Sequence, residues 1–228
     1  MSYSYQKGFS WPLALFGLVV TIILVGMIVP LFTFSRSGGP LTEAHNNAKA
    51  IAGALNIFRQ EYGRYPCDFT RKILEEKGHD NLPSGTSANA YLAQLVATGI
   101  IDSETYFFAP GMEGIRRGDD EKASGRLLEK GENGFAYIMA EGGESLGGDI
   151  SITPLVIAPI RRSDGPPVFD PEAYGDRYVY GAVDGSSKQG EIQEDGTAAR
   201  KGHAHLFEGG PDSLFGDETP VIKYPLGF

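Results

Sequence analysis

Two histidines near the end of the chain are the best candidates for metal chemistry. His203 and His205 are two residues apart, so on a strand both imidazoles would point to one face of a sheet. Two imidazoles on one face suit zinc, and Glu208 or Asp212 could add an oxygen ligand. A catalytic zinc site needs a third protein ligand, and the other two histidines are remote in the sequence. The alternative interpretation is a solvated strand edge that binds no metal.

Other catalytic signatures are missing from the sequence. There is no Gly-x-Ser-x-Gly turn for a nucleophilic serine, and no glycine-rich loop precedes a helix as phosphate binding requires. Cys67 is the only cysteine, so an intrachain disulfide cannot form. We expect Cys67 to be a small buried hydrophobe, with an intermolecular disulfide as the alternative. The sequence therefore predicts a protein that is not an enzyme and has no catalytic residue or cofactor.

The charge balance argues against nucleic acid as a partner. The chain carries 20 Lys and Arg against 29 Asp and Glu, a net charge of −9. Binding to a phosphate backbone depends on clustered basic residues. Adjacent arginines occur in only two pairs, Arg116-Arg117 and Arg161-Arg162.

A long apolar segment precedes all of these residues. Residues 9–34 form a run of 26 residues without a charged side chain. As a helix the run would be roughly 39 Å long, more than a hydrocarbon core of about 30 Å requires. A secretory signal peptide has a shorter apolar stretch followed by small residues at a cleavage site, which Leu31–Arg36 does not offer. The sequence thus predicts one transmembrane helix over residues 9–34.

The flanking charges set the expected orientation. Residues 1–8 form a short tail that carries Lys7 and no acid, which favours a cytoplasmic N-terminus. The remainder of the chain, residues 41–228, is then expected outside the cytoplasm, in the periplasm or beyond the cell. Pro30 lies inside the apolar segment and is expected to kink its helix.

Two helices should position the rest of the chain. Residues 35–40 have the composition of a flexible break, and apolar residues then recur at helical spacing from Thr42 to Tyr62. Gly63 and Pro66 end this amphipathic helix, whose apolar stripe is expected to pack on a sheet. A shorter helix is predicted from Ser87 to Thr98.

The remaining pattern indicates strands and turns. Long polar loops are expected over 111–133 and 185–202, and Asp184-Gly185 has typical turn chemistry. Helices followed by strands indicate an α+β fold with an antiparallel sheet. The predicted strands are Thr105–Ala109, Gly134–Met139, Ile152–Ile160, Arg177–Val183 and His203–Phe207.

Several motifs together resemble the type IV pilins and type II secretion pseudopilins. Gln6-Lys7-Gly8-Phe9 is similar to a prepilin processing site, with a basic residue, a glycine and a phenylalanine that opens the apolar helix. Pro30 falls where pilin helices commonly carry a proline. Residues 48–51 and Tyr62-Gly63-Arg64-Tyr65-Pro66 look like the pseudopilin helix that ends in a Gly-x-Tyr-Pro turn.

Later segments add to the resemblance. Gly134–Tyr137, Pro154–Ile157 and Val183–Ser186 are similar to segments of the pseudopilin-like proteins of planctomycete and verrucomicrobial bacteria. The resemblance implies a pilin-like fold and a structural subunit of a secretion or pilus-like filament, anchored in the bacterial inner membrane. It implies other pseudopilins and secretion-machinery proteins as partners. It also implies a prepilin peptidase that cuts between Gly8 and Phe9.

The sequence departs from the family pattern at Leu13, where pilins carry a glutamate. That glutamate is thought to pair with the processed N-terminus of a neighbouring subunit, so its loss implies a low-copy or tip-like subunit. The break at 35–40 also interrupts what is usually one helix. Major pseudopilins often bind calcium in a late loop, for which Asp212, Asp217 and Glu218 offer oxygen atoms without the spacing of an EF-hand.

Two other functions remain open from the sequence. The same anchor and acidic domain would suit a binding or adhesion protein that is never processed at Gly8. A membrane-anchored metal-dependent enzyme built on His203 and His205 is the further alternative.

Overall fold

The structure is a computed structural model. It describes residues 39–122, 126–140, 151–163, 166–198, 206–207, 214–215 and 219–227. The predicted leader, the apolar segment with Pro30, and residues 35–38 of the predicted break lie outside the described residues. Within the described ranges, no helix combines the length and the apolar character that a membrane span requires.

The first described helix, α2, spans Pro40–Tyr62. It confirms the helix predicted from Thr42, and the additional proline at its start is tolerated because the first helical N–H needs no partner. One face of α2 is buried, as the apolar stripe predicts. The buried residues are Ala44, Asn47, Ala48, Ile51, Ala52, Ala54, Leu55 and Phe58.

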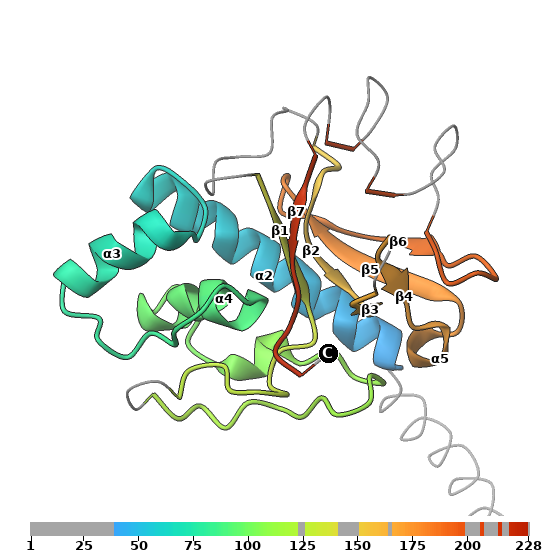
Figure 1. Ribbon diagram of the computed structural model, residues 1–228, viewed down its shortest axis with the longest axis horizontal. Coiled ribbons are helices and arrows are strands. Elements are labelled where there is room, and N and C mark those ends of the chain that lie inside the picture. The colour runs from blue at the N-terminus through green and yellow to red at the C-terminus, as the bar shows by residue number, and fades with distance from the viewer. Residues whose placement is uncertain are drawn as a thin grey trace, which may run out of the picture. The chain divides into compact units, whose positions relative to one another are not determined.

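A five-stranded sheet in the order β6-β5-β2-β1-β7 forms the centre of the fold (Figure 1). All four neighbouring pairs are antiparallel, so the predicted α+β fold with an antiparallel sheet is confirmed. A separate pair of short strands, β3 (Ile160–Arg161) and β4 (Val168–Phe169), is also antiparallel. The strands of the large sheet are β1 (Ala136–Met139), β2 (Pro154–Ala158), β5 (Arg177–Ala182), β6 (Ser187–Glu191) and β7 (Val221–Lys223).

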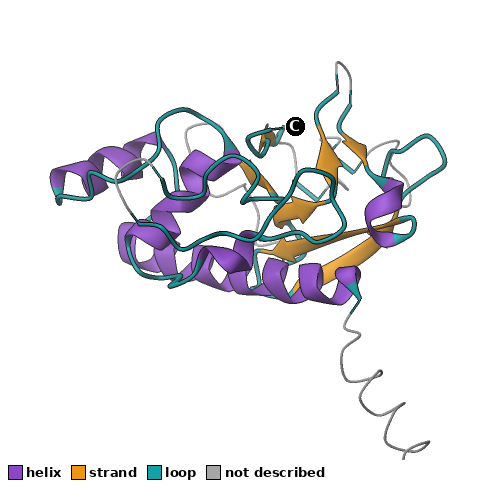
Figure 2. Ribbon diagram, turned by 90° about the horizontal axis from the view of Figure 1, so that it is seen from below, coloured by secondary structure: helices purple, strands orange, loops and turns teal. Residues whose placement is uncertain are grey.

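Helix α2 packs directly on one face of this sheet, as the view from below in Figure 2 shows. The closest approach is at Gly181 of β5. A Cβ atom there would lie 2.3 Å from the carbonyl oxygen of Ala48 and 2.8 Å from the Cβ of Ala52. Small residues on both elements therefore allow the helix to cross the strand at short distance.

The other face of the sheet carries a second apolar cluster, which includes Tyr178 and Tyr180 of β5. Buried residues from connecting segments complete it, and two of them, Ile192 and Ala198, lie in the segment 185–202 that was predicted to be a polar loop. The prediction of a loop over 185–202 is wrong at residues 187–191, which form β6. The residues that complete the cluster from connecting segments are Ile192, Ala198, Leu206, Leu214 and Phe215.

Three further helices surround α2 and the sheet. Helix α4 (Ala88–Ala97) confirms the second predicted helix, and the hydroxyl of Ser87 caps it by accepting the N–H of Ala90 at 3.3 Å. Helix α3 (Asp68–Glu76) and the single turn α5 (Pro171–Tyr174) had no counterpart in the prediction.

The strand predicted at Thr105–Ala109 is wrong, because Glu104–Phe107 forms the 3₁₀ helix η1. The Ser103 hydroxyl accepts the N–H of Thr105, and the Asp120 carboxylate accepts the N–H of Glu104 at 2.6 Å. These side-chain bonds take backbone donors that a strand would offer to a neighbouring strand.

Two other predicted strands are corrected. The strand predicted at Ile152–Ile160 is shorter and divides into β2 and the start of β3 at Pro159. Of His203–Phe207, only Leu206 and Phe207 are described, and both lie in a turn. The long predicted loop over 111–133 is irregular in its described residues, as expected.

Candidate functional site

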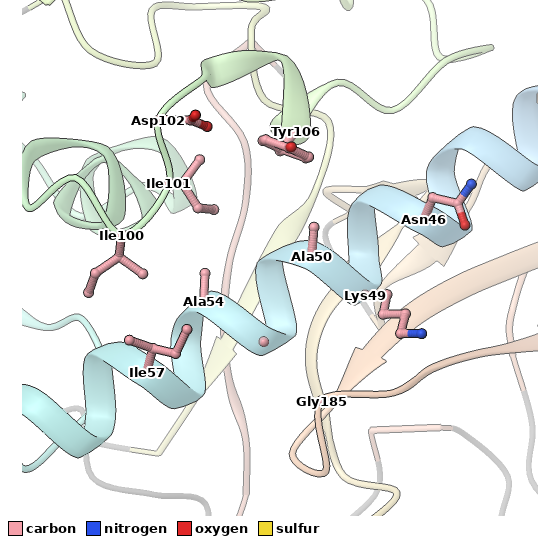
Figure 3. A pocket seen from close by; sticks show the side chains of 11 residues that line it. Asn46, Lys49, Ala50, Ala54, Ile57, Ile100, Ile101, Asp102, Tyr106 and Gly185 are labelled. Carbon is pink, nitrogen blue, oxygen red and sulfur yellow. The ribbon is translucent and has the colours of Figure 1, made fainter.

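A groove of about 510 Å³ runs along the face of α2 that the sheet does not cover (Figure 3). Ala50, Gly53, Ala54 and Ile57 form its floor, and they lie on successive turns of one helix face. Ile57 is 53% exposed. This face of α2 is therefore apolar although water contacts it.

The segment between α4 and η1 forms the opposite wall. Ile100, Ile101 and Asp102 come directly after the end of α4, and Tyr106 projects from η1 toward the groove. Tyr106 is 40% exposed, so two large hydrophobic side chains, Ile57 and Tyr106, are accessible in one groove.

The charges at the groove are few and balanced. Lys49 lies at one end on α2, and Asp102 lies on the opposite wall. The groove is thus suited to bind an apolar chain segment, and its rim carries one positively and one negatively charged residue.

Gly53 gives the groove room along its floor. A Cβ atom at Gly53 would meet no atom within 4 Å. A single added methyl group there would therefore contact no other described part of the fold. Gly53 is therefore the position at which the groove can be filled while the packing of α2 on the sheet is left intact.

A cluster of carboxylates is the second candidate, and it lies beside η1. Glu104, Asp119 and Glu132 bring one oxygen each to within 4.8 Å of one another, which is close enough to share a cation. Glu104 and Glu132 are fully buried, and Asp119 is exposed.

Arginines already supply positive charge to this cluster. Arg116 Nη1 lies 2.8 Å from Glu132 Oε1, without the geometry of a hydrogen bond, and Arg116 also lies 4.0 Å from Asp119. Arg126 lies 3.6 Å from Asp119 on the solvent side. The guanidinium groups therefore occupy the electrostatic role that a bound cation would have.

The Glu104 carboxylate also has a backbone role. Its two oxygens accept the N–H of Leu128 at 2.8 Å and the N–H of Asp120 at 3.2 Å. Leu128 and Asp120 both have positive φ, at 49° and 59°, which is strained for residues with a side chain. Glu104 thus stabilises two strained positions of the loop that follows η1.

Burial raises the pKa of both buried acids. For Glu104 the desolvation outweighs the hydrogen bond from Leu128, and the charge of Glu132 raises the pKa further. For Glu132 desolvation outweighs the hydrogen bond from Glu129 and the attraction of Arg116. The cluster is most simply a structural clamp of the irregular segment 111–133.

The residues predicted from the sequence to be functional lie outside the described part of the chain. This applies to Gly8, Phe9, Leu13 and Pro30, and equally to the zinc candidates and to the calcium candidates near the C-terminus. His45 lies on α2 and His79 follows α3, so these two histidines belong to different elements.

Cys67 and the basic pairs are described. Cys67 is 1% exposed and free, as expected for a small buried hydrophobe. Arg117 pairs with Glu43, and Arg161 with Asp170 at 2.6 Å. Together with Arg116, three of the four arginines in the two pairs thus contact carboxylates.

Sequence reasoning missed both described sites. Ile57 and Ala50 lie off the apolar stripe of α2, and an apolar residue on the exposed face was the available signal for the groove. The carboxylate cluster combines Glu104 of η1 with two acids of the irregular segment 111–133, and no spacing rule connects them. The chain matches no family model, no curated protein and no solved structure in the comparisons with known proteins.

Proposed function

We propose that this chain is a pseudopilin-like structural subunit of a type II secretion or type IV pilus-like filament, present in few copies or at the tip. In this proposal the apolar segment 9–34 anchors it in the bacterial inner membrane with a cytoplasmic N-terminus. The domain from residue 41 then lies in the periplasm or outside the cell. Its partners are other pseudopilins, the secretion machinery and a prepilin peptidase.

The observation that carries the proposal is the two-sided character of α2. One face is buried on an antiparallel sheet, and the opposite face forms the floor of an apolar groove. An uncharged apolar run ends six residues before this helix begins. A helix that holds a domain on one side and leaves an apolar contact on the other suits a subunit that packs beside copies or relatives of itself.

Leu13 supports the low copy number. A charge held unpaired at the centre of an apolar helix costs on the order of 2.5–3.5 kcal/mol on insertion scales. Pairing with a neighbour's amine would remove that cost and set the register between helices, and leucine cannot accept an amine. A homopolymer would leave every Phe9 amine without its partner, whereas a tip subunit has no neighbour above it. Quantitative mass spectrometry of purified filaments should find this chain as a minor component.

Processing is the first experiment. Full-length protein is expressed with an active prepilin peptidase, extracted from membranes, and measured as intact mass. The proposal expects the loss of residues 1–8 and a new N-terminus at Phe9, and a Gly8→Ile control should stay full-length. A wild-type chain that stays full-length beside a processed control pilin would favour the anchored binding domain.

The groove gives a second experiment on the same proposal. Gly53→Glu places a charge on the groove floor, where the added Cβ would meet no described atom within 4 Å. We expect this variant to fold and to be lost from the filament fraction, because a carboxylate would be desolvated in the contact. Gln60→Glu adds the same charge to an exposed position of α2 outside the groove and should leave incorporation unchanged. Equal incorporation of both variants would remove the groove from the proposed interface.

A further inference from the structure

Strand β6 is an edge strand whose hydrogen-bond phase is fixed by both ends of its hairpin. At the turn, the N–H of Ala182 donates to the carbonyl of Ser186 at 2.8 Å. At the other end, the N–H of Ile192 donates to the carbonyl of Asp176 at 2.8 Å. Bonded and non-bonded pairs alternate along an antiparallel ladder, so these two bonds determine which residues between them face β5.

The alternation leaves three residues of β6 with both backbone groups directed away from the sheet. Lys188 and Gly190 lie opposite Tyr180 and Tyr178 in the bonded phase. Their neighbours in the strand therefore have outward N–H and C=O groups, and no strand among the described residues pairs with that edge. These residues are Ser187, Gln189 and Glu191.

The charged side chains of β6 do not block this edge. Lysine on an edge strand commonly prevents pairing with another chain. Here the ammonium of Lys188 is held by its own hairpin turn, 3.5 Å from the carboxylate of Asp184 and 3.0 Å from the hydroxyl of Ser186. Gly190 has no side chain to obstruct an approaching strand.

We propose that two copies of this chain pair through β6 in an antiparallel contact centred on Gln189. In this register Gln189 faces itself, Ser187 faces Glu191 of the second copy, and Lys188 faces Gly190 of the second copy. All six outward backbone groups of each β6 strand then gain a partner, and the two sheets become one continuous ten-stranded sheet. The contact brings no like charges into opposition.

Other two-fold registers fit the strand less well. A centre on Lys188 would place two ammonium groups directly opposite, which is destabilising in a strand pair. A centre on Gly190 would leave Ser187 beyond the end of the partner strand. A centre on Glu191 would place two carboxylates directly opposite, which is destabilising in a strand pair. A centre on Ser187 would leave Glu191 beyond the end of the partner strand. The backbone phase and the charges therefore select Gln189.

This inference is independent of the proposed function. A two-fold contact closes on itself and does not extend into a filament. It uses the residues of β6, none of which lines the groove on α2, so either proposal can fail without the other.

Disulfide trapping tests the register in the full-length chain, in membranes. The α-carbons of directly opposed bonded residues are about 5.5 Å apart, within disulfide range. Gln189→Cys should thus form a covalent dimer on mild oxidation. In the same register the two Glu191 α-carbons are roughly 14 Å apart, so Glu191→Cys alone should not. A mixture of Ser187→Cys and Glu191→Cys chains should give heterodimers. The native Cys67 thiol is buried, so we expect it to form no crosslink of its own.

A proline variant tests the contact without a crosslink. The N–H of Gln189 points away from β5, so Gln189→Pro removes only an outward donor, which edge strands tolerate. We expect the detergent-purified variant to keep its thermal transition and to fall from dimer to monomer mass in light scattering. Equal crosslinking at positions 189 and 191, no crosslinking at all, or a folded Gln189→Pro chain with unchanged mass would each overturn the proposal.

Discussion

Tyr174 on α5 buries a hydroxyl group that has no hydrogen-bond partner among the described residues. Burial raises the pKa of this phenol, and the charges of Glu43 and Asp170 raise it further, so it stays protonated. An unsatisfied buried polar group costs about 1–3 kcal/mol. The ring packs in the apolar core, whereas the hydroxyl contributes no hydrogen bond within the described part of the chain. Removing the hydroxyl alone therefore tests whether its burial destabilises the fold.

Tyr174→Phe should leave the fold intact and raise the free energy of unfolding by up to about 1 kcal/mol. Tyr137→Phe is the matched control, since the Tyr137 hydroxyl is buried and donates to the carbonyl of Pro66 at 3.1 Å. That variant should lose about 1 kcal/mol. Urea denaturation of both variants measures the difference, and a loss of stability in Tyr174→Phe would show that the hydroxyl has a partner.

At the scale of elements, the contact between α2 and β5 depends on small side chains. Gly181→Ala would place a Cβ against the backbone of Ala48, which cannot yield as a side-chain end can. We expect a loss of about 1–3 kcal/mol from overpacking. Gly53→Ala on the same helix meets open space and should gain roughly 0.5–1 kcal/mol from helix propensity. Thermal melts in which both variants changed stability in the same direction would contradict the packing of α2 on β5.

The carboxylate clamp beside η1 should give the chain a pH dependence. The folded pKa values of Glu104 and Glu132 are raised, so the folded state binds protons more readily than the unfolded chain. Their contribution to stability is therefore full below the unfolded pKa, about 4.3, and is lost as the pH rises through the folded pKa. A Glu104→Gln and Glu132→Gln double variant should show a smaller fall in unfolding free energy between pH 4.5 and about 7. If the double variant showed the same change of unfolding free energy with pH as the wild type, other titratable groups would account for the pH dependence.

Periodicity and turn chemistry in the sequence were sufficient to predict the elements whose residues interact locally. Helices α2 and α4 and the Asp184-Gly185 turn follow from spacing, caps and the αL conformation that Gly185 adopts at φ 76°. Strand β6 could not be predicted because its side chains are polar and its order comes from pairing with β5. Residues 105–109 have strand propensity, yet the Ser103 hydroxyl accepts the N–H of Thr105 and the distant Asp120 accepts the N–H of Glu104 just before them.

The sites were harder to predict than the elements. The groove depends on how the segment after α4 lies against α2, which is a tertiary relation between residues about fifty positions apart. The carboxylate cluster arises because burial brings together acids that look solvated in the sequence. Buried Glu104 and Glu132 had no apolar pattern to reveal them.

At the scale of the whole molecule, the topology expected from the apolar segment can be tested directly. Protease added to spheroplasts should digest the domain that begins at Leu41, because that domain is expected outside the cytoplasm. A cytoplasmic marker protein serves as the control for intact membranes. Complete protection of the domain would contradict the predicted orientation.

The two covered faces of the sheet have a consequence for the order in which amide hydrogens exchange with solvent. Strands β1 and β2 have neighbours on both sides, and apolar clusters cover both of their faces. Their amides should exchange only when the whole domain unfolds, so their protection reports the global free energy. The outward amide of Gln189 should exchange rapidly in a single chain and slowly in a pair. One deuterium-uptake map would thus measure the stability of the fold and the occupancy of its open edge.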